Sequence, residues 1–129
     1  MTRINLIPVE ELCDQHLLAE HRELTRIPNG LLAGKLKYNY VDRSDSFTLG
    51  KGHVKFFTDK LDWLFQRYNH IHQECLMREF NVTYKFRCNE LVEVGYRFDN
   101  YWTPSKSDIE VSRERILSKM PKHPRFTKY

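Results

Sequence analysis

Three carboxylates, two histidines and one arginine fall within the eleven residues 14–24, DQHLLAEHREL. Placing each residue about 100° around a helix axis from the last separates two faces. The apolar face holds Leu17, Leu18, His21 and Leu24, and the opposite face holds Glu23, His16 and Ala19, flanked by Gln15, Arg22 and Arg26. The second face is either a solvated surface with local ion pairs or a reaction site. In a reaction site, a carboxylate would move protons or stabilise developing positive charge.

A second group able to do chemistry lies at the start of the sequence, Met1-Thr2-Arg3. A small residue after an initiator methionine favours removal of that methionine, which exposes the α-amino group of Thr2. An α-amino group has a pKa of about 7.7–8.0, so roughly a third of it is neutral at pH 7.5. A neutral amine is a nucleophile that forms a Schiff base with an aldehyde carbon. Thr2 and Glu23 are therefore a candidate nucleophile and carboxylate, provided that the fold brings them together.

Metal and disulfide chemistry is not indicated. His16 and His21 are five residues apart and diverge on a helix, and the zinc-binding pattern HExxH does not occur. Cys13, Cys75 and Cys88 are odd in number and contain no CxxC pair, which predicts reduced thiols in an intracellular, cytoplasmic protein. From these spacings we expect no metal site. No run approaches the roughly 18 apolar residues of a membrane span, so we also expect no membrane contact.

The elements that must position these groups are predicted to be helices. A chain of 129 residues with 40% hydrophobic residues suits one compact domain over residues 1–129. From the periodicity of its apolar residues we expect this domain to be all-α, with about three helices and long connecting loops. The first helix runs from about Val9 or Asp14 past Arg26 and is weakened at 28–30, Pro-Asn-Gly. The second follows a glycine-rich turn at 50–52, and its apolar stripe alternates steps of three and four: Val54, Phe57, Leu61, Leu64, Tyr68, Ile71 and Cys75.

The third predicted helix follows Pro104 and stops at Pro121. Ser107 and Glu110 fit a capping box at its start, and its apolar face holds Ile109, Ile116 and Met120. Residues 81–104 before it are rich in aromatic side chains, and the TYKFRC stretch is either a short strand or an aromatic-packed loop. The glycines at 50 and 52 lack the rest of a P-loop; a tight turn is favoured, and a phosphate site at the following helix start is the alternative.

The net charge of +4 lies entirely in residues 105–129, which hold seven basic residues against three acidic ones. The last segment, 121–129, is both basic and aromatic, with Phe126 and Tyr129 among lysines and arginines. A basic, aromatic end suits a polyanion such as nucleic acid, although a solubilising tail has the same composition.

Several stretches together carry a family resemblance. The opening MTRINLIPVEELCDQHLLAEHREL resembles the start of the bacteriophage T4 endonuclease V family, the pyrimidine-dimer DNA glycosylases with apurinic-site lyase activity. The likeness continues, in order, at LGKGHV (49–54), FF (56–57), DKL (59–61), ECL (74–76), Ser112-x-x-Arg115-x-x-x-Lys119 and the basic, aromatic end at 124–129. It spans nearly the whole chain, and residues 27–48 and 81–103 diverge most.

The resemblance implies a repair enzyme that acts on double-stranded DNA with damaged pyrimidines, without metal or organic cofactor. We expect a monomer, because one small domain suffices for this chemistry. The Thr2 amine would attack C1′ of the damaged nucleotide, and Glu23 would stabilise the cationic intermediate and assist β-elimination at the abasic site. The matched DNA-contacting positions are Arg3, Gln15, His16, Arg22, Arg26, Arg115 and Lys119. Extrusion of a base opposite the lesion, which costs a few kcal/mol, would open access to the sugar.

Departures from the family pattern leave two alternatives. The segment 27–48 is shorter and less basic than in the T4 enzyme, Thr25 replaces a proline, and Phe126-Thr127 replaces a larger aromatic pair. A glycosylase and lyase of the same class for a different lesion is one alternative. A DNA-binding protein without catalysis is the other.

Overall fold

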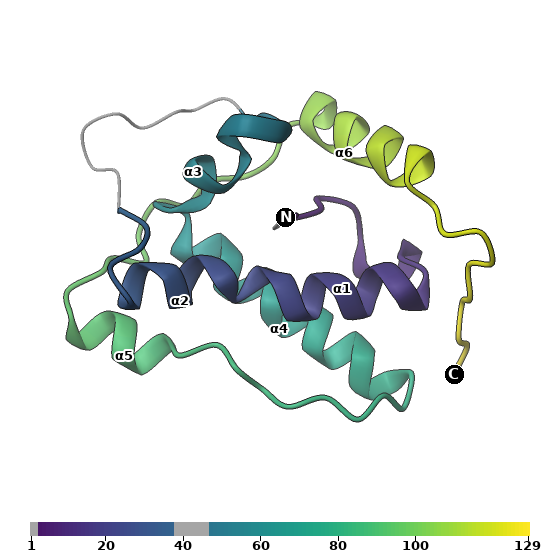
Figure 1. Ribbon diagram of the computed structural model, residues 1–129, viewed down its shortest axis with the longest axis horizontal. Coiled ribbons are helices and arrows are strands. Elements are labelled where there is room, and N and C mark those ends of the chain that lie inside the picture. Colours follow the sequence, from purple (N-terminus) through teal and green to yellow (C-terminus); the bar gives the residue numbers. More distant parts are fainter. Residues whose placement is uncertain (1–2, 38–46) are drawn as a thin grey trace.

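The computed structural model describes residues 3–37 and 47–129. In these ranges the chain is helical and contains no strand, which confirms the all-α prediction. The α-helices are α1 (Asp14–Leu24), α2 (Arg26–Leu32), α3 (His53–Phe57), α4 (Leu61–Met77), α5 (Cys88–Glu93) and α6 (Lys106–Ser118), with 3-10 turns at Val9–Glu11 and Gly50–Gly52. In Figure 1, α1 and α2 run end to end across α4, and α6 lies on the other side of the N-terminal segment. None of the described helices is long and apolar enough to cross a membrane.

The first predicted helix is two helices in the structure. α1 begins at Asp14, as predicted, but Thr25 separates it from α2, so the division lies before the predicted weak point at Pro28. Pro28 falls in the first turn of α2, where a missing backbone N–H costs nothing. The predicted apolar face of α1 is confirmed, since Leu17 and Leu24 are fully buried and His21 nearly so.

The second predicted helix is also divided in the structure, into α3 and α4, so the prediction of one continuous helix is wrong. Six members of that stripe are fully buried, so the spacing identified the core: Phe57, Leu61, Leu64, Tyr68, Ile71 and Cys75. At the break between the two helices, Asp59 and Lys60 pair in the interior at 2.8 Å, and Asn100 donates to the Asp59 carbonyl and carboxylate. Lys60 then caps α4 in a non-helical conformation.

The start of α6 differs from the prediction by two residues. Ser105 is the N-cap, and its hydroxyl accepts from the Asp108 N–H at 3.1 Å while the Asp108 carboxylate accepts from the Ser105 N–H. The capping box is therefore Ser105–Asp108, not Ser107–Glu110. The TYKFRC stretch forms no strand; its Phe86 is buried against the core and it leads into the short α5, which the sequence did not predict.

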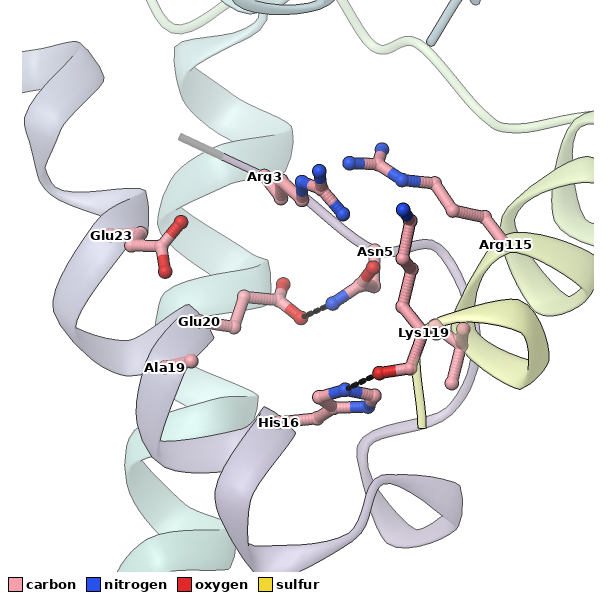
Figure 2. Close-up of a pocket in the computed structure, with 9 residues that line it drawn as sticks. Arg3, Asn5, His16, Ala19, Glu20, Glu23, Arg115 and Lys119 are labelled. Carbon is pink, nitrogen blue, oxygen red and sulfur yellow. Dashed lines mark hydrogen bonds between the residues drawn. The ribbon is translucent and has the colours of Figure 1, made fainter. Parts of the chain in front are cut away.

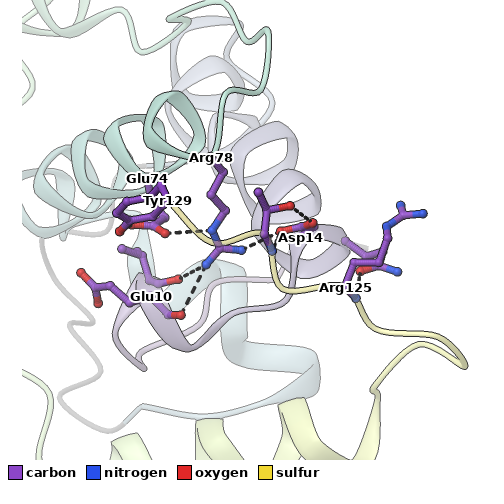
Figure 3. Close-up of polar contacts among 9 residues, drawn as sticks. Glu10, Asp14, Glu74, Arg78, Arg125 and Tyr129 are labelled. Carbon is purple, nitrogen blue, oxygen red and sulfur yellow. Dashed lines mark hydrogen bonds and ion pairs between the residues drawn. The ribbon is translucent and has the colours of Figure 1, made fainter.

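Buried charges join the ends of the chain to the core. Arg78 at the end of α4 pairs with Asp14 at 3.0 Å and with Glu74 at 2.8 Å (Figure 3). Thr127 of the last segment donates to the Asp14 carboxylate, and the Tyr129 hydroxyl donates to Glu74. Burial acts to raise the pKa of Asp14, but the bonds from Thr127 and Arg78 outweigh it, so this pKa lies below its usual value. The basic, aromatic segment 121–129 is therefore bonded across the start of α1.

Candidate active site

A cavity of about 460 Å³ opens between the N-terminal segment, α1 and α6 (Figure 2). Its volume is in the range of small-molecule and nucleotide pockets. The lining residues are Arg3 and Asn5 from the N-terminal segment, His16, Ala19, Glu20 and Glu23 from α1, and Arg115, Ile116 and Lys119 from α6 and its end. Three segments that are far apart in the sequence therefore line one cavity.

The α1 side of the cavity is the polar face predicted from the sequence. His16, Ala19, Glu20 and Glu23 follow the spacing i, i+3, i+4, i+7, which is one face of a helix. Because α1 buries its leucines against α4, this face is directed at the cavity. Ala19 is the small residue among them and leaves open space between the two glutamates and His16.

The two carboxylates of this face have different surroundings. Glu20 is 2% exposed and accepts bonds from Asn5 at 2.8 Å and from Arg67 at 2.8 and 3.0 Å. It is thus a structural counter-charge for Arg67. Glu23 is half-buried, one turn further along, and its carboxylate points into the cavity toward Arg3 (Figure 2). Of the two carboxylates, Glu23 is the one that a molecule bound in the cavity would contact.

Three cations face Glu23 across the cavity. The side chains of Arg3, Arg115 and Lys119 converge in Figure 2. Burial lowers the pKa of Arg115, the nearby Arg3 lowers it further, and Glu23 acts in the opposite direction. This cluster of like charges beside one carboxylate favours an anionic ligand such as a phosphate, which relieves the repulsion among the cations.

His16 connects the two walls of the cavity. Its Nε2 lies 3.1 Å from the carbonyl oxygen of Lys119. A carbonyl only accepts, so Nε2 carries the proton and donates. His16 thereby fixes the end of α6, and with it Lys119, against α1.

Not all the residues predicted for the site line this cavity. Gln15 lies beside it on α1, and its amide donates to the His123 carbonyl and accepts from the Arg125 N–H, so it holds the C-terminal segment. Arg22 and Arg26 are exposed and do not line the cavity. Thr2 lies outside the described residues. The other predicted residues do line it: Arg3, His16, Glu23, Arg115 and Lys119.

Sequence reasoning missed the groups that hold the N-terminal segment. Asn5 is bonded to Glu20, the Leu6 N–H donates to the Ser112 hydroxyl at 2.9 Å, and Arg67 donates to the Ile7 carbonyl. Ser112 belongs to the motif Ser112-x-x-Arg115-x-x-x-Lys119, one turn before Arg115. That spacing was the available signal, because it places Ser112 and Arg115 on one face of α6.

The protein is a helical domain whose cationic cavity holds one accessible carboxylate, an arrangement that suits a phosphate-bearing substrate. No group of three or more His, Cys, Asp or Glu side chains arranged to hold a metal ion occurs in residues 3–37 and 47–129.

The family is identified by comparison with known protein families. Residues 1–88 match the family described as pyrimidine dimer DNA glycosylase, and the chain belongs to this family. It is accordingly a DNA repair glycosylase, and its substrate is DNA containing pyrimidine dimers. The matched range contains Arg3, α1 with Glu23, and the LGKGHV stretch, while Arg115 and Lys119 lie beyond it.

Proposed function

We propose that this glycosylase is bifunctional, cleaving the N-glycosyl bond through an imine with the Thr2 α-amine and then nicking the strand by β-elimination. One observation carries the proposal: Arg3, the residue directly after Thr2, lines the same cavity as Glu23. Consecutive Cα atoms are about 3.8 Å apart, so an amine on residue 2 is close in the chain to that cavity.

In the first step, the neutral Thr2 amine attacks C1′ of the damaged nucleotide. A bond forms between its nitrogen and C1′, while the C1′–base bond breaks and its electron pair leaves with the base, which takes up a proton. The amine loses a proton, and its nitrogen lone pair then forms the C1′=N bond while the C1′–O4′ bond breaks. O4′ keeps the electron pair of that bond and takes up a proton, so the sugar ring opens and a protonated imine remains. Glu23 stabilises the positive charge that develops at C1′ and on the imine nitrogen.

In the second step, a base removes a proton from C2′. The electron pair of that C–H bond forms a double bond between C2′ and C3′, and the bond between C3′ and its phosphate oxygen breaks with its electron pair leaving on the phosphate. Glu23 is the group proposed to take this proton, since a carboxylate that faces the imine is placed to act on the adjacent carbon. Water then hydrolyses the imine and frees the Thr2 amine.

The cations have a separate role in substrate binding. We assign Arg3, Arg115 and Lys119 to the phosphates on either side of the reacting sugar, where they also offset the repulsion between Glu23 and the DNA backbone. Arg22, Arg26, Gln15 and His16 are assigned to the surrounding DNA contact. The whole chain, 1–129, is proposed to act as one domain and as a monomer.

The test is strand scission on three matched duplexes: one with a single thymine dimer, one with an abasic site, and one undamaged. The proposal predicts direct nicks in the first two and none in the third. Alkali-labile but unbroken dimer strands would show a glycosylase without lyase activity. Cleavage of the abasic duplex alone would show a lyase that takes its glycosylase step on another lesion. Binding without scission of either damaged duplex would show a non-catalytic protein.

A further inference from the structure

The N-terminal segment approaches the cavity as an extended chain held by hydrogen bonds from several elements. Nearest the chain end, the Ile4 N–H donates to Nε2 of His53, at the start of α3, over 2.8 Å. Ile4 follows Arg3 directly in the sequence, so this bond holds the backbone two residues after Thr2. His53 is 3% exposed and does not itself line the cavity.

The two bonds of the His53 ring fix its protonation state. Nε2 accepts from a backbone N–H and so has no proton, while Nδ1 lies 3.0 Å from the Thr48 carbonyl, which only accepts, so Nδ1 carries the proton. The ring is thus the neutral Nδ1–H tautomer. A proton on Nε2 would face the Ile4 N–H, and because both groups are donors the hydrogen bond between them would be lost.

We propose that neutral His53 is a positioning residue for the N-terminal nucleophile, which it aligns by accepting the Ile4 N–H, and that protonation of His53 releases the chain end and slows imine formation. This inference rests on the proposed function, in which the Thr2 amine attacks C1′. His53 touches no reacting atom. It acts through the backbone of residues 3 and 4.

The glycine turn before α3 serves this arrangement. Gly50 has a φ of +74°, which a side chain would strain, and a Cβ on Gly52 would meet the Thr48 side chain at 2.9 Å. The chain therefore folds back tightly enough for the Thr48 carbonyl to reach Nδ1. The two glycines of the LGKGHV stretch thus permit the bond between Thr48 and His53.

The surroundings of His53 keep it neutral. The rings of Phe47 and Phe57 pack edge-on against it, and three charged groups face it from other elements: Arg3 of the N-terminal segment, Glu20 of α1 and Arg115 of α6. Burial lowers the pKa of His53 below its usual 6.5, and the charges of Arg115 and Arg3 lower it further. The hydrogen bond to Thr48 and the charge of Glu20 raise this pKa in part. The acceptor is accordingly present at neutral pH and lost in acid.

Two variants separate this role from a merely structural one. His53→Leu removes the acceptor. His53→Gln restores an acceptor oxygen near the position of Nε2 and does not titrate. His70→Gln, at an exposed histidine on α4, is the matched control. Borohydride trapping on a preformed abasic duplex measures imine formation from pH 5 to pH 8, and melting curves and DNA affinity are recorded for each variant.

His53→Leu is expected to slow trapping at pH 7.5 by up to about 100-fold, the loss typical of a misplaced reacting group, with DNA affinity nearly unchanged. His53→Gln is expected to recover most of that rate. In acid, the wild-type trapping rate should fall because two groups are protonated, the Thr2 amine and His53. The rate of His53→Gln should fall because of the amine alone. His70→Gln should follow the wild type.

Two results would overturn the inference: equal trapping rates for wild type and His53→Leu, or the same acid profile for wild type and His53→Gln. If His53→Leu does not fold, the acid profile of His53→Gln decides alone. Failure of the proposed function is distinguishable, because wild-type protein would then give no adduct at Thr2 at any pH.

Discussion

Glu20 and Glu23 lie one helical turn apart on α1 and face the same cavity, yet Glu20 is bonded to Arg67 and Asn5 while Glu23 points across the open space toward Arg3. The first carboxylate holds the structure together and the second is available to substrate. This difference predicts opposite outcomes for the same chemical change at the two positions.

Glu23→Gln is expected to lower single-turnover scission of a dimer duplex by about 100- to 10,000-fold, the range for loss of a proton-transfer group. The substitution keeps the side-chain shape and removes a negative charge next to DNA phosphates, so lesion binding should be equal or tighter. Gel-shift titration measures the binding. Cleavage by Glu23→Gln at the wild-type rate would show that the carboxylate has no role.

Glu20→Gln is expected to destabilise the fold by about 3 kcal/mol, because it leaves the buried Arg67 guanidinium without its counter-charge. Urea unfolding measures the change. Glu90→Gln is the control, since its pair with Arg87 is half exposed and worth at most about 1 kcal/mol. Equal midpoints for the two variants would refute the structural role of Glu20.

Arg115→Ala and Lys119→Ala are each expected to weaken DNA binding and to reduce the slope of log affinity against log salt by about 0.9 per lost phosphate contact. The effect should be similar on damaged and undamaged duplexes, because phosphates carry no lesion information. Arg97→Ala, at an exposed pair with Asp99, is the control. An unchanged salt slope in both cavity variants would remove these residues from the DNA contact.

His21 is expected to titrate near pH 4, because burial lowers its pKa from 6.5 to about 4, with His72 and Lys85 acting in the same direction. The folded state then binds fewer protons than the unfolded chain. The stability that neutral His21 contributes is therefore complete above pH 6.5 and lost as the pH falls toward 4. Titration of the His21 ring by NMR measures this directly, and a midpoint near 6.5 would contradict the buried contact with Tyr68.

Local periodicity was enough to predict the α1 face and the buried stripe that runs from Phe57 through α4. Leu17 and Leu24 on one side and His16 and Glu23 on the other follow from helical geometry alone, and the fold places them accordingly. The stripe through α3 and α4 was likewise identified by its spacing. In both cases the information lies within a few turns of the chain.

The errors arose where distant residues decide the local structure. The break between α3 and α4 lies at the buried pair Asp59–Lys60, and Asn100, far along the chain, is bonded to Asp59 there. Arg78 and Asp14 are separated by 64 positions, and no spacing rule joins them. The bonds of Gln15 to His123 and Arg125 of the C-terminal segment likewise join residues far apart in the sequence, and no spacing rule predicts them.

Borohydride trapping on a duplex with one thymine dimer tests for the imine between the Thr2 amine and the sugar of the damaged nucleotide. Peptide mapping of the adduct identifies the amine, with undamaged duplex and N-terminally acetylated protein as controls. We expect an adduct at the Thr2 nitrogen, absent from both controls. An adduct on a lysine, or efficient scission by the acetylated protein, would contradict it.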